Sequence, residues 1–162
     1  MIMKIPEGEG GRAVKKAMRL LEHMDRTERG LRDRLNQEGF SQEATDKAIE
    51  YVKSYGYIND DRYARNYIAF RIHSLSRHKI IQDLIRKGVD RETADQAWEE
   101  ESALNDYDEQ SLLKNTIEKK YSADTQLDEK EMRRLYGYLV RRGFQFSDIA
   151  SVLEELNIRI EK

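Results

Sequence analysis

The chain has 162 residues, of which 37% are charged and 38% hydrophobic, and its formal net charge is −2. A charge this close to zero argues against a protein that holds nucleic acid by overall positive charge. The absence of cysteine excludes disulfides and thiol chemistry. No apolar stretch approaches the ~20 residues of a membrane-spanning helix. The first residues, MIMKIPEGEGGR, lack the apolar core of a signal peptide, so we expect a cytoplasmic protein without a membrane partner.

One ten-residue phrase occurs three times. It reads LRDRLNQEGF, IIQDLIRKGV and LYGYLVRRGF, and its glycines are Gly39, Gly88 and Gly143. Apolar residues stand eight and four positions before each glycine and directly after it. Residues four apart lie on one helix face, and glycine suits the left-handed position just past a helix end. The phrase therefore predicts a helix that ends in a tight turn. Its recurrence after 49 and 55 residues predicts a helical repeat array.

The predicted elements form three sets of three helices. Residues 1–11 are rich in glycine and charge, and we expect a flexible, frayed tail there. The first set covers residues 12–57. Its first helix starts at Arg12, and Thr27 and Ser41 are placed to cap the next two helices.

The second set covers residues 58–105, and Asn59, Ser76 and Asp90 are placed to cap its helices. We expect its last helix to end in the acidic run Glu99–Glu101. An apolar stripe at helical spacing marks the first helix of this set, at Tyr63, Tyr67 and Phe70.

The third set covers residues 106–162. Asp128 and Glu131 have the spacing of a capping box before its second helix, and Ser147 is placed to cap the last one. No segment alternates over the length of a strand. The sequence thus predicts an all-α protein of nine helices in which neighbouring sets stack on each other.

Motifs for catalysis, metal binding and cofactor binding are absent from the sequence. There is no glycine-rich phosphate loop. The three histidines, His23, His73 and His78, do not have metal-ligand spacing. We therefore expect a binding protein without catalytic residues, cofactor or metal.

Charge is distributed unevenly along the chain. Residues 62–91 contain 8 basic and 2 acidic side chains, residues 92–132 contain 4 and 13, and residues 133–142 contain 4 and none. Arginine forks suit phosphate and carboxylate groups. The candidate partner- or DNA-binding residues are Arg62, Arg65, Arg71, Arg77, Lys79, Arg86, Lys87, Arg133, Arg134, Arg141 and Arg142.

Tyrosines could add base stacking to such a surface. They stand at positions 51, 55, 57, 63 and 67. Their helical spacing favours core packing over stacking on bases.

Four segments together resemble the RecX family, the regulators of the bacterial recombinase RecA. They read TERGLRDRLNQEGF, GYINDDRYARNYIAFR, KIIQDLIRKGV and YLVRRGFQFSDI. The resemblance implies three tandem three-helix repeats in an elongated, curved monomer. It also implies docking in the groove of the RecA filament on single-stranded DNA, with restrained filament growth and lowered ATPase and strand exchange. The family's most recognisable positions fall on Asp60, Arg62, Tyr63, Ala64 and Arg71, of which Tyr63 and Ala64 are expected to be structural.

Three hypotheses stay open at this point. The first is a non-enzymatic modulator of RecA, chiefly an inhibitor, that reaches single-stranded DNA through the filament. The second is a helical repeat protein that binds DNA directly, with affinity that falls steeply with salt. The third is a helical scaffold for another protein, in which the basic stretches are incidental.

Overall fold

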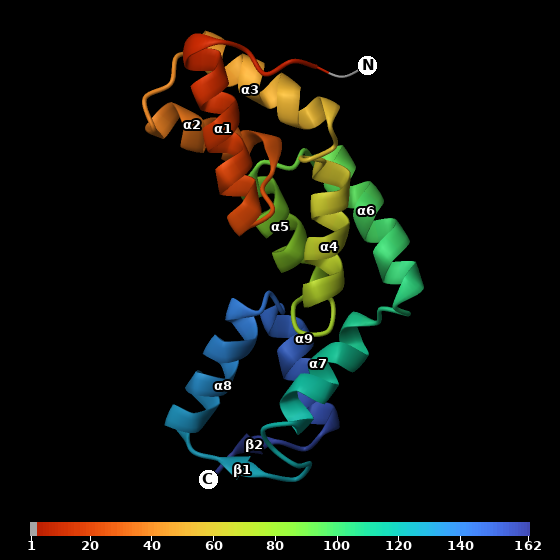
Figure 1. Cartoon of the computed structure of the whole chain (residues 1–162). Coiled ribbons are helices and arrows are strands. Elements are labelled where there is room, and N and C mark those ends of the chain that lie inside the picture. Colours follow the sequence, from red (N-terminus) through yellow and green to blue (C-terminus); the bar gives the residue numbers. More distant parts are fainter. Residues whose placement is uncertain (1–2) are drawn as a thin grey trace. The chain divides into compact units, whose positions relative to one another are not determined.

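The structure, a computed structural model, describes residues 3–162. In this part the chain forms nine α-helices and two strands of two residues each (Figure 1). The predicted all-α class with nine helices is confirmed. The helices are α1 (Gly8–His23), α2 (Glu28–Gln37), α3 (Gln42–Ser54), α4 (Asp60–Arg71), α5 (Arg77–Lys87), α6 (Arg91–Leu104), α7 (Glu109–Glu118), α8 (Glu129–Arg141) and α9 (Phe146–Glu155). Strand β1 (Gln126–Leu127) pairs in parallel with β2 (Arg159–Ile160), and Gln126 lies opposite Arg159.

The three phrases form the predicted helix and turn. Gly39, Gly88 and Gly143 have left-handed φ angles of +92°, +109° and +97°. The residue after each glycine donates its backbone N–H to the carbonyl five residues earlier, at 3.3 Å (Phe40 to Leu35), 3.0 Å (Val89 to Leu84) and 3.1 Å (Phe144 to Leu139). The apolar residues before the glycines are buried, with exposed fractions of at most 2%: Leu31, Leu35, Ile80, Leu84, Leu135 and Leu139.

The third helix of every set ends in the same kind of turn. Its left-handed residues are Gly56, Asp106 and Asn157, with φ angles of +71°, +49° and +57°. The N–H of the next residue returns to the carbonyl five positions earlier, as from Tyr57 to Val52 at 2.9 Å. The sequence indicated this turn only at Gly56, because aspartate and asparagine adopt the left-handed conformation less often than glycine.

The start of the first helix differs from the prediction. Helix α1 begins at Gly8 and not at Arg12, so residues 8–11 of the predicted tail are helical; residues 1–2 of that tail lie outside the described residues. Gly10 and Gly11 are buried, and a Cβ on Gly11 would overlap the carbonyl group of Pro6. Glycine here permits close packing. The Glu9 carboxylate also accepts the Ser41 N–H at 2.8 Å, which fixes this end of the helix.

Three other local predictions were wrong. Helix α6 continues through the acidic run to Leu104, in keeping with the good helix propensity of glutamate. Helix α9 begins at Phe146, so Ser147 lies inside it and does not cap it. Phe70 is 87% exposed, because α4 buries the face of Ala64 and Ile68. The strands were missed because two residues cannot show alternation.

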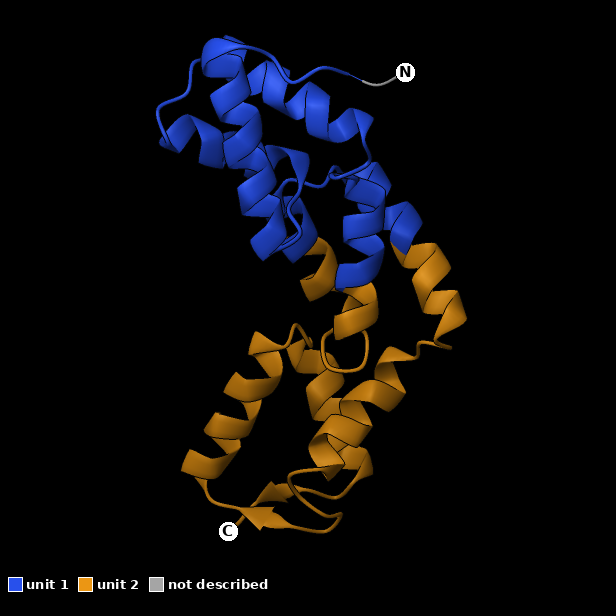
Figure 2. Ribbon diagram, viewed as in Figure 1, with its two compact units in different colours: residues 1–67, 83–97 blue, residues 68–82, 98–162 orange. Residues whose placement is uncertain are grey.

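The chain forms two compact units (Figure 2). Unit 1 runs to Tyr67 and includes Asp83–Ala97, and unit 2 comprises Ile68–Gln82 and Trp98–Lys162. A cluster centred on Leu31, Leu35 and Ile49 forms the core beneath α1–α3 in unit 1. In unit 2, a cluster that includes Leu139 and Ile149 forms the core beneath α7–α9. The second set of helices is therefore shared between the units.

A hydrogen-bonded junction lies inside unit 1. Thr27, 3% exposed, caps α2 by accepting the Gly30 N–H at 2.9 Å, and its hydroxyl donates to the Lys87 carbonyl at the end of α5. The next N–H, that of Glu28, donates to the Asp60 carboxylate at 2.9 Å. The start of α2 thus binds the end of α5 and the start of α4.

Unit 2 contains an equivalent junction. Ser76, 1% exposed, caps α5 by accepting the Lys79 N–H at 3.1 Å, and its own N–H donates to the Arg142 carbonyl after α8 at 3.0 Å. The next N–H, that of Arg77, donates to the Glu109 carboxylate at 3.0 Å. Each unit is therefore built around one junction between successive sets, which explains why the second set is divided.

Candidate binding surfaces

The eleven predicted basic residues fall into two groups. Unit 1 contains Arg62, Arg65, Arg86 and Lys87. Unit 2 contains Arg71, Arg77, Lys79, Arg133, Arg134, Arg141 and Arg142. The structure thus places candidate residues from the second set in both units.

The three unit 1 arginines among them all have intramolecular partners, and Arg86 lies 3.6 Å from the Asp83 carboxylate. Arg62 donates through Nη1 to the Gly56 carbonyl at 2.9 Å and so closes the turn after α3. Arg65 forms an ion pair with Asp61 at 2.9 Å, one turn earlier on α4. These contacts give Arg62 and Arg65 a role in local structure, whatever else they bind.

A polar pocket of about 380 Å³ in unit 1 brings Arg86 and Lys87 together with three arginines that the sequence did not single out. These are Arg26, Arg29 and Arg34. The Nε of Arg26 is buried without a hydrogen-bond partner among the described residues. Five cations therefore converge on the end of α5, and the junction explains how: Arg29 donates to the Arg86 carbonyl.

Sequence reasoning missed these three arginines because the first 61 residues contain nearly equal numbers of basic and acidic side chains. Asp25 and Asp33 also line the pocket and reduce its net charge. The sequence shows that these three arginines stand just before and along α2. It does not show that they lie close to α5, because this depends on the long-range hydrogen bond from Thr27 to Lys87.

The tyrosines of the first two sets pack mainly against one another. The ring centroids of Tyr51 and Tyr55 lie 4.9 Å apart, and those of Tyr55 and Tyr57 lie 5.6 Å apart. Tyr67 is 9% exposed and donates its hydroxyl to Asp83 at 3.2 Å. The ring centroids of Tyr63 and Tyr67 lie 6.2 Å apart, and Tyr63 also lines the polar pocket.

Arg77 lies among acidic and aromatic groups of unit 2. Its guanidinium is 3.6 Å from the Glu99 carboxylate and 5.8 Å from the Trp98 ring. Burial, followed by the nearby Glu109 carboxylate, raises the pKa of the Tyr107 hydroxyl, which is bonded to Glu109 at 3.0 Å. Neighbouring carboxylates compete with any external anion, so Arg77 is poorly suited to bind phosphate.

Three other cations of unit 2, Lys79, Lys120 and Arg142, lie near the C-terminal end of α8. The ring of Tyr138 has two cations against it, Lys120 at 4.1 Å and Arg142 at 4.4 Å from the centroid. Arg142 also donates to the Ser74 carbonyl at 3.1 Å. A Cβ on Gly143 would contact Lys79, so the junction brings Lys79 next to this turn. Arg71 lies at the end of α4, half-buried, where its carbonyl accepts two backbone N–H groups.

Helix α8 extends this cluster. Arg134 precedes Tyr138 by one turn and Arg141 follows Arg134 by two turns, so the three lie on one face. Arg133, Arg134 and Arg141 are exposed, and no ion pair joins them to other residues in the described chain. We call Lys120, Arg134, Arg141 and Arg142 the α8 basic face. Its geometry suits phosphate or carboxylate groups.

Within residues 3–162, the acidic and histidine side chains form no group of three or more that could hold a metal ion. None of the helices in this range combines the length and the apolar character that a membrane span needs. The chemistry of the described surface is that of two basic clusters, one in each unit.

Comparisons with known proteins agree with this arrangement of helices. Three sequence models of the RecX family match the chain in tandem: the first three-helix domain at residues 13–51, the second at residues 59–97 and the third at residues 106–153. A protein of Trichlorobacter lovleyi named Regulatory protein RecX is 35% identical over 143 residues, which are 86% of this chain and 92% of that protein.

The Regulatory protein RecX of Clostridium perfringens strain SM101 is 32% identical over 158 residues, which are 94% of this chain and 72% of that protein. The crystal structure of RecX from Lactobacillus salivarius has a TM-score of 0.68 to this chain at 18% identity, covering 92% of this chain and 97% of that one. That likeness concerns the fold alone. The resemblance noted in the sequence is thereby confirmed, and the chain belongs to the RecX family of regulatory proteins.

Proposed function

We propose that this chain is a non-enzymatic modulator of RecA, and first of all an inhibitor. It binds in the groove of the RecA filament on single-stranded DNA and limits filament growth, ATPase and strand exchange. Membership of the RecX family, to which the relatives named Regulatory protein RecX belong, is the observation that carries the proposal. The proposal brings with it a cytoplasmic location, because the filament assembles on chromosomal DNA, and it takes the chain to act as a monomer.

The basic clusters supply the means of binding. A filament on single-stranded DNA presents phosphates together with protein carboxylates, and both are ligands for arginine forks. The α8 basic face meets that requirement best, because Arg134 and Arg141 are exposed and have no ion pair among the described residues. The acidic stretch 92–132 would be repelled by phosphate and so orients the chain.

The test is the single-strand-DNA-dependent ATPase rate of the cognate RecA, titrated with the protein below equimolar amounts. The wild type is expected to lower the rate at substoichiometric ratios, because one molecule that stops filament growth affects many subunits. The double variant Arg134→Glu/Arg141→Glu should need about a hundredfold more protein for half-inhibition, since each of the two lost hydrogen bonds to a charged group contributes roughly 1.5–3 kcal/mol and about 1.4 kcal/mol is tenfold in affinity.

The matched control is Lys15→Glu/Arg19→Glu, which also reverses two charges on exposed helix positions, in this case on α1. It should inhibit like the wild type. No effect of the folded wild-type protein on ATPase would refute the proposed function. Equal inhibition by both double variants would show that the α8 basic face does not take part in the inhibition.

Direct DNA binding is the second candidate, and the polar pocket of unit 1 favours it. Five cations and the half-buried Tyr63 line that pocket, a combination that suits a phosphate beside a base. This candidate predicts tight binding to naked single-stranded DNA with a steep dependence on salt. Strong binding to filaments together with weak binding to naked DNA would exclude it.

A further inference from the structure

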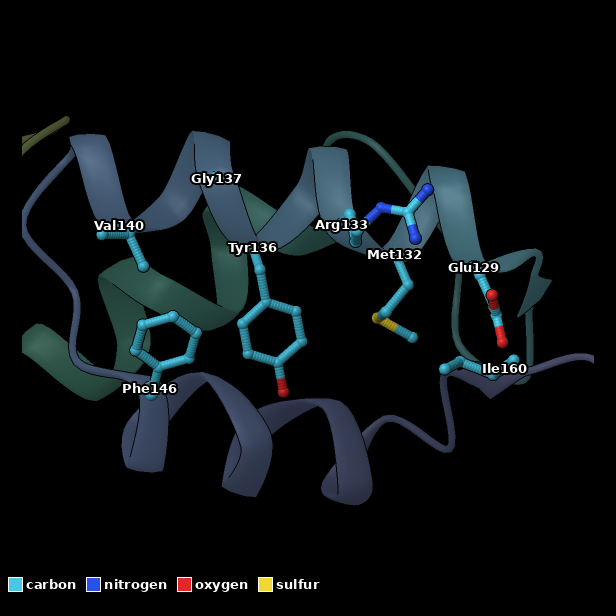
Figure 3. Close-up of a pocket in the computed structure, with 8 residues that line it drawn as sticks. All are labelled: Glu129, Met132, Arg133, Tyr136, Gly137, Val140, Phe146 and Ile160. Carbon is cyan, nitrogen blue, oxygen red and sulfur yellow. The ribbon is translucent and has the colours of Figure 1, made fainter.

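An apolar groove lies between α8 and α9, with β2 at one end (Figure 3). Its volume is about 730 Å³. Met132, Tyr136 and Val140 point from α8 toward α9, from which Phe146 points back. The rings of Tyr136 and Phe146 stack with centroids 5.5 Å apart. The charged residues that line the groove are Glu129 and Arg133.

The apolar lining is open to solvent. Phe146 is 65% exposed, Ile160 47% and Val140 38%. Exposed apolar side chains gathered in one depression are typical of interaction sites. An apolar partner that filled this groove would gain the free energy of covering these side chains.

Gly137 lines the groove and leaves space there, because it has no side chain. It lies inside α8, where glycine is less favourable than alanine by roughly 0.5–1 kcal/mol. Packing does not require a glycine there, because a Cβ would meet only the flexible end of Arg141, at 3.1 Å. A residue that weakens the helix and leaves space on the groove wall is readily explained by a partner that enters that space.

The shape of the groove indicates the form of this partner. The lining positions on α8 run from Glu129 to Val140 along one helix face, a length of about 16 Å at 1.5 Å per residue. A second amphipathic helix fits such a surface with anchors at i, i+4 and i+7. Met132, Val140 and Ile160 give the lining an aliphatic part, and the two aromatic rings, of Tyr136 and Phe146, already stack on each other. This arrangement favours protein side chains over nucleobases as the occupant.

The charges beside the groove indicate the sign of the partner. One acidic residue, Glu129, and one basic residue, Arg133, line the groove. Beyond Glu129 the balance is basic, because Arg134 and Arg141 follow on α8 and Arg142 directly after it, and residues 133–142 contain no acidic side chain. A partner helix with an apolar stripe flanked by carboxylates would complement both the apolar groove and the arginines beside it. Resting on the proposed function, we propose that this groove binds an amphipathic helix with acidic flanks on a RecA subunit.

The probe is the cognate RecA itself, without DNA, titrated into the fluorescently labelled chain and followed by anisotropy. Gly137→Leu fills the groove and raises helix propensity, so it keeps the fold. Phe146→Ser removes an anchor from the opposite wall. Each should weaken binding to RecA by about tenfold or more: Phe146→Ser because it removes one apolar side chain that the partner would bury, and Gly137→Leu because the new side chain occupies the space that the partner would enter. Gln96→Leu adds an exposed leucine to α6 instead and should bind like the wild type.

Arg133→Glu tests the charge of the partner. It should weaken binding to RecA about as much as Gly137→Leu at low salt, and Arg133→Lys should retain most of the affinity. Naked single-stranded DNA should bind Gly137→Leu and wild type equally. These results together would support an acidic helix on RecA as the occupant.

Other results would overturn the groove proposal. If wild type, Gly137→Leu and Phe146→Ser bind RecA equally, the groove does not contact RecA, although the proposed function stands. Loss of DNA binding alone in Gly137→Leu would identify nucleic acid as the occupant, and loss of self-association alone would identify a second copy of the chain. A wild-type chain that neither binds RecA nor lowers its ATPase would refute both proposals.

Discussion

Replacing Gly143 by alanine should destabilise the protein more than the same change at Gly39. Both residues end the second helix of a set, with φ angles of +97° and +92°. An L-residue in this left-handed conformation costs about 1–2 kcal/mol, and this cost is common to both sites. A Cβ on Gly39 meets nothing within 4 Å, whereas a Cβ on Gly143 would overlap the Ser76 hydroxyl and the Lys79 side chain.

The difference between the two variants measures how tightly the junction of unit 2 is packed. Steric insertion into a packed site costs about 1–3 kcal/mol. Gly143→Ala should therefore lose about 2–5 kcal/mol, against about 1–2 kcal/mol for Gly39→Ala. Gly88→Ala should resemble Gly143→Ala, because its Cβ would lie 2.6 Å from the Cβ of Arg29 in the junction of unit 1.

Urea unfolding followed by far-ultraviolet circular dichroism measures these free energies. The single tryptophan, Trp98, provides a second probe inside unit 2, where it is 3% exposed and packs edge-on against Tyr107 at 4.8 Å. Its fluorescence should report a lower urea midpoint for Gly143→Ala than for Gly39→Ala. Equal losses at Gly39 and Gly143, within about 0.5 kcal/mol, would refute the reasoning.

Three further predictions concern stability. Thr27→Ala should cost about 1 kcal/mol for the lost cap and a further ~1–3 kcal/mol for the Lys87 carbonyl left without its donor. The control Ser41→Ala removes a cap and a hydrogen bond to Glu9 from an exposed residue, so water can replace the lost donor and the cost should stay near the first amount. Equal costs in urea unfolding would contradict the junction. Ile68→Ala should cost about 2–5 kcal/mol of unfolding free energy and Phe70→Ser less than about 0.5 kcal/mol, because Ile68 is 0% and Phe70 87% exposed. A large loss of stability in Phe70→Ser would show that Phe70 packs in the core, as the sequence predicted. Burial, partly offset by the Glu28 N–H, raises the pKa of the Asp60 carboxyl, so its ionisation disfavours the folded state as pH rises above the ordinary value of 3.8. Asp60→Asn can still accept the Glu28 N–H, and its stability relative to wild type should therefore rise between pH 3 and pH 7 in urea titrations; a relative stability that falls with pH would show that the carboxylate is stabilising.

Local sequence patterns determined most of the secondary structure. The spacing of Leu31, Leu35 and Gly39, and of its two copies, was sufficient to predict helices that end in left-handed turns. The caps at Thr27, Ser41 and the other polar residues could be predicted because a cap bonds to a backbone N–H only three residues away. The same segments also indicated the family, which the tandem matches confirm.

The tertiary structure decided which of these local features meet. The hydrogen bonds from Glu28 to Asp60 and from Arg77 to Glu109 each join residues 32 positions apart, a regularity that was present in the sequence but had no local meaning. Phe70 lost its predicted place in the core because Ala64 and Ile68 filled the buried face.

The candidate surfaces were predicted only in part. The sequence identified the basic residues of α8, because they are adjacent in the chain, but it missed Arg26, Arg29 and Arg34, which join Arg86 and Lys87 only through the fold. The apolar groove was missed as well, since its walls come from α8, α9 and β2. Helices and turns depend on interactions within a few residues and can be predicted from spacing, whereas a pocket depends on packing between distant segments, which only the tertiary structure specifies.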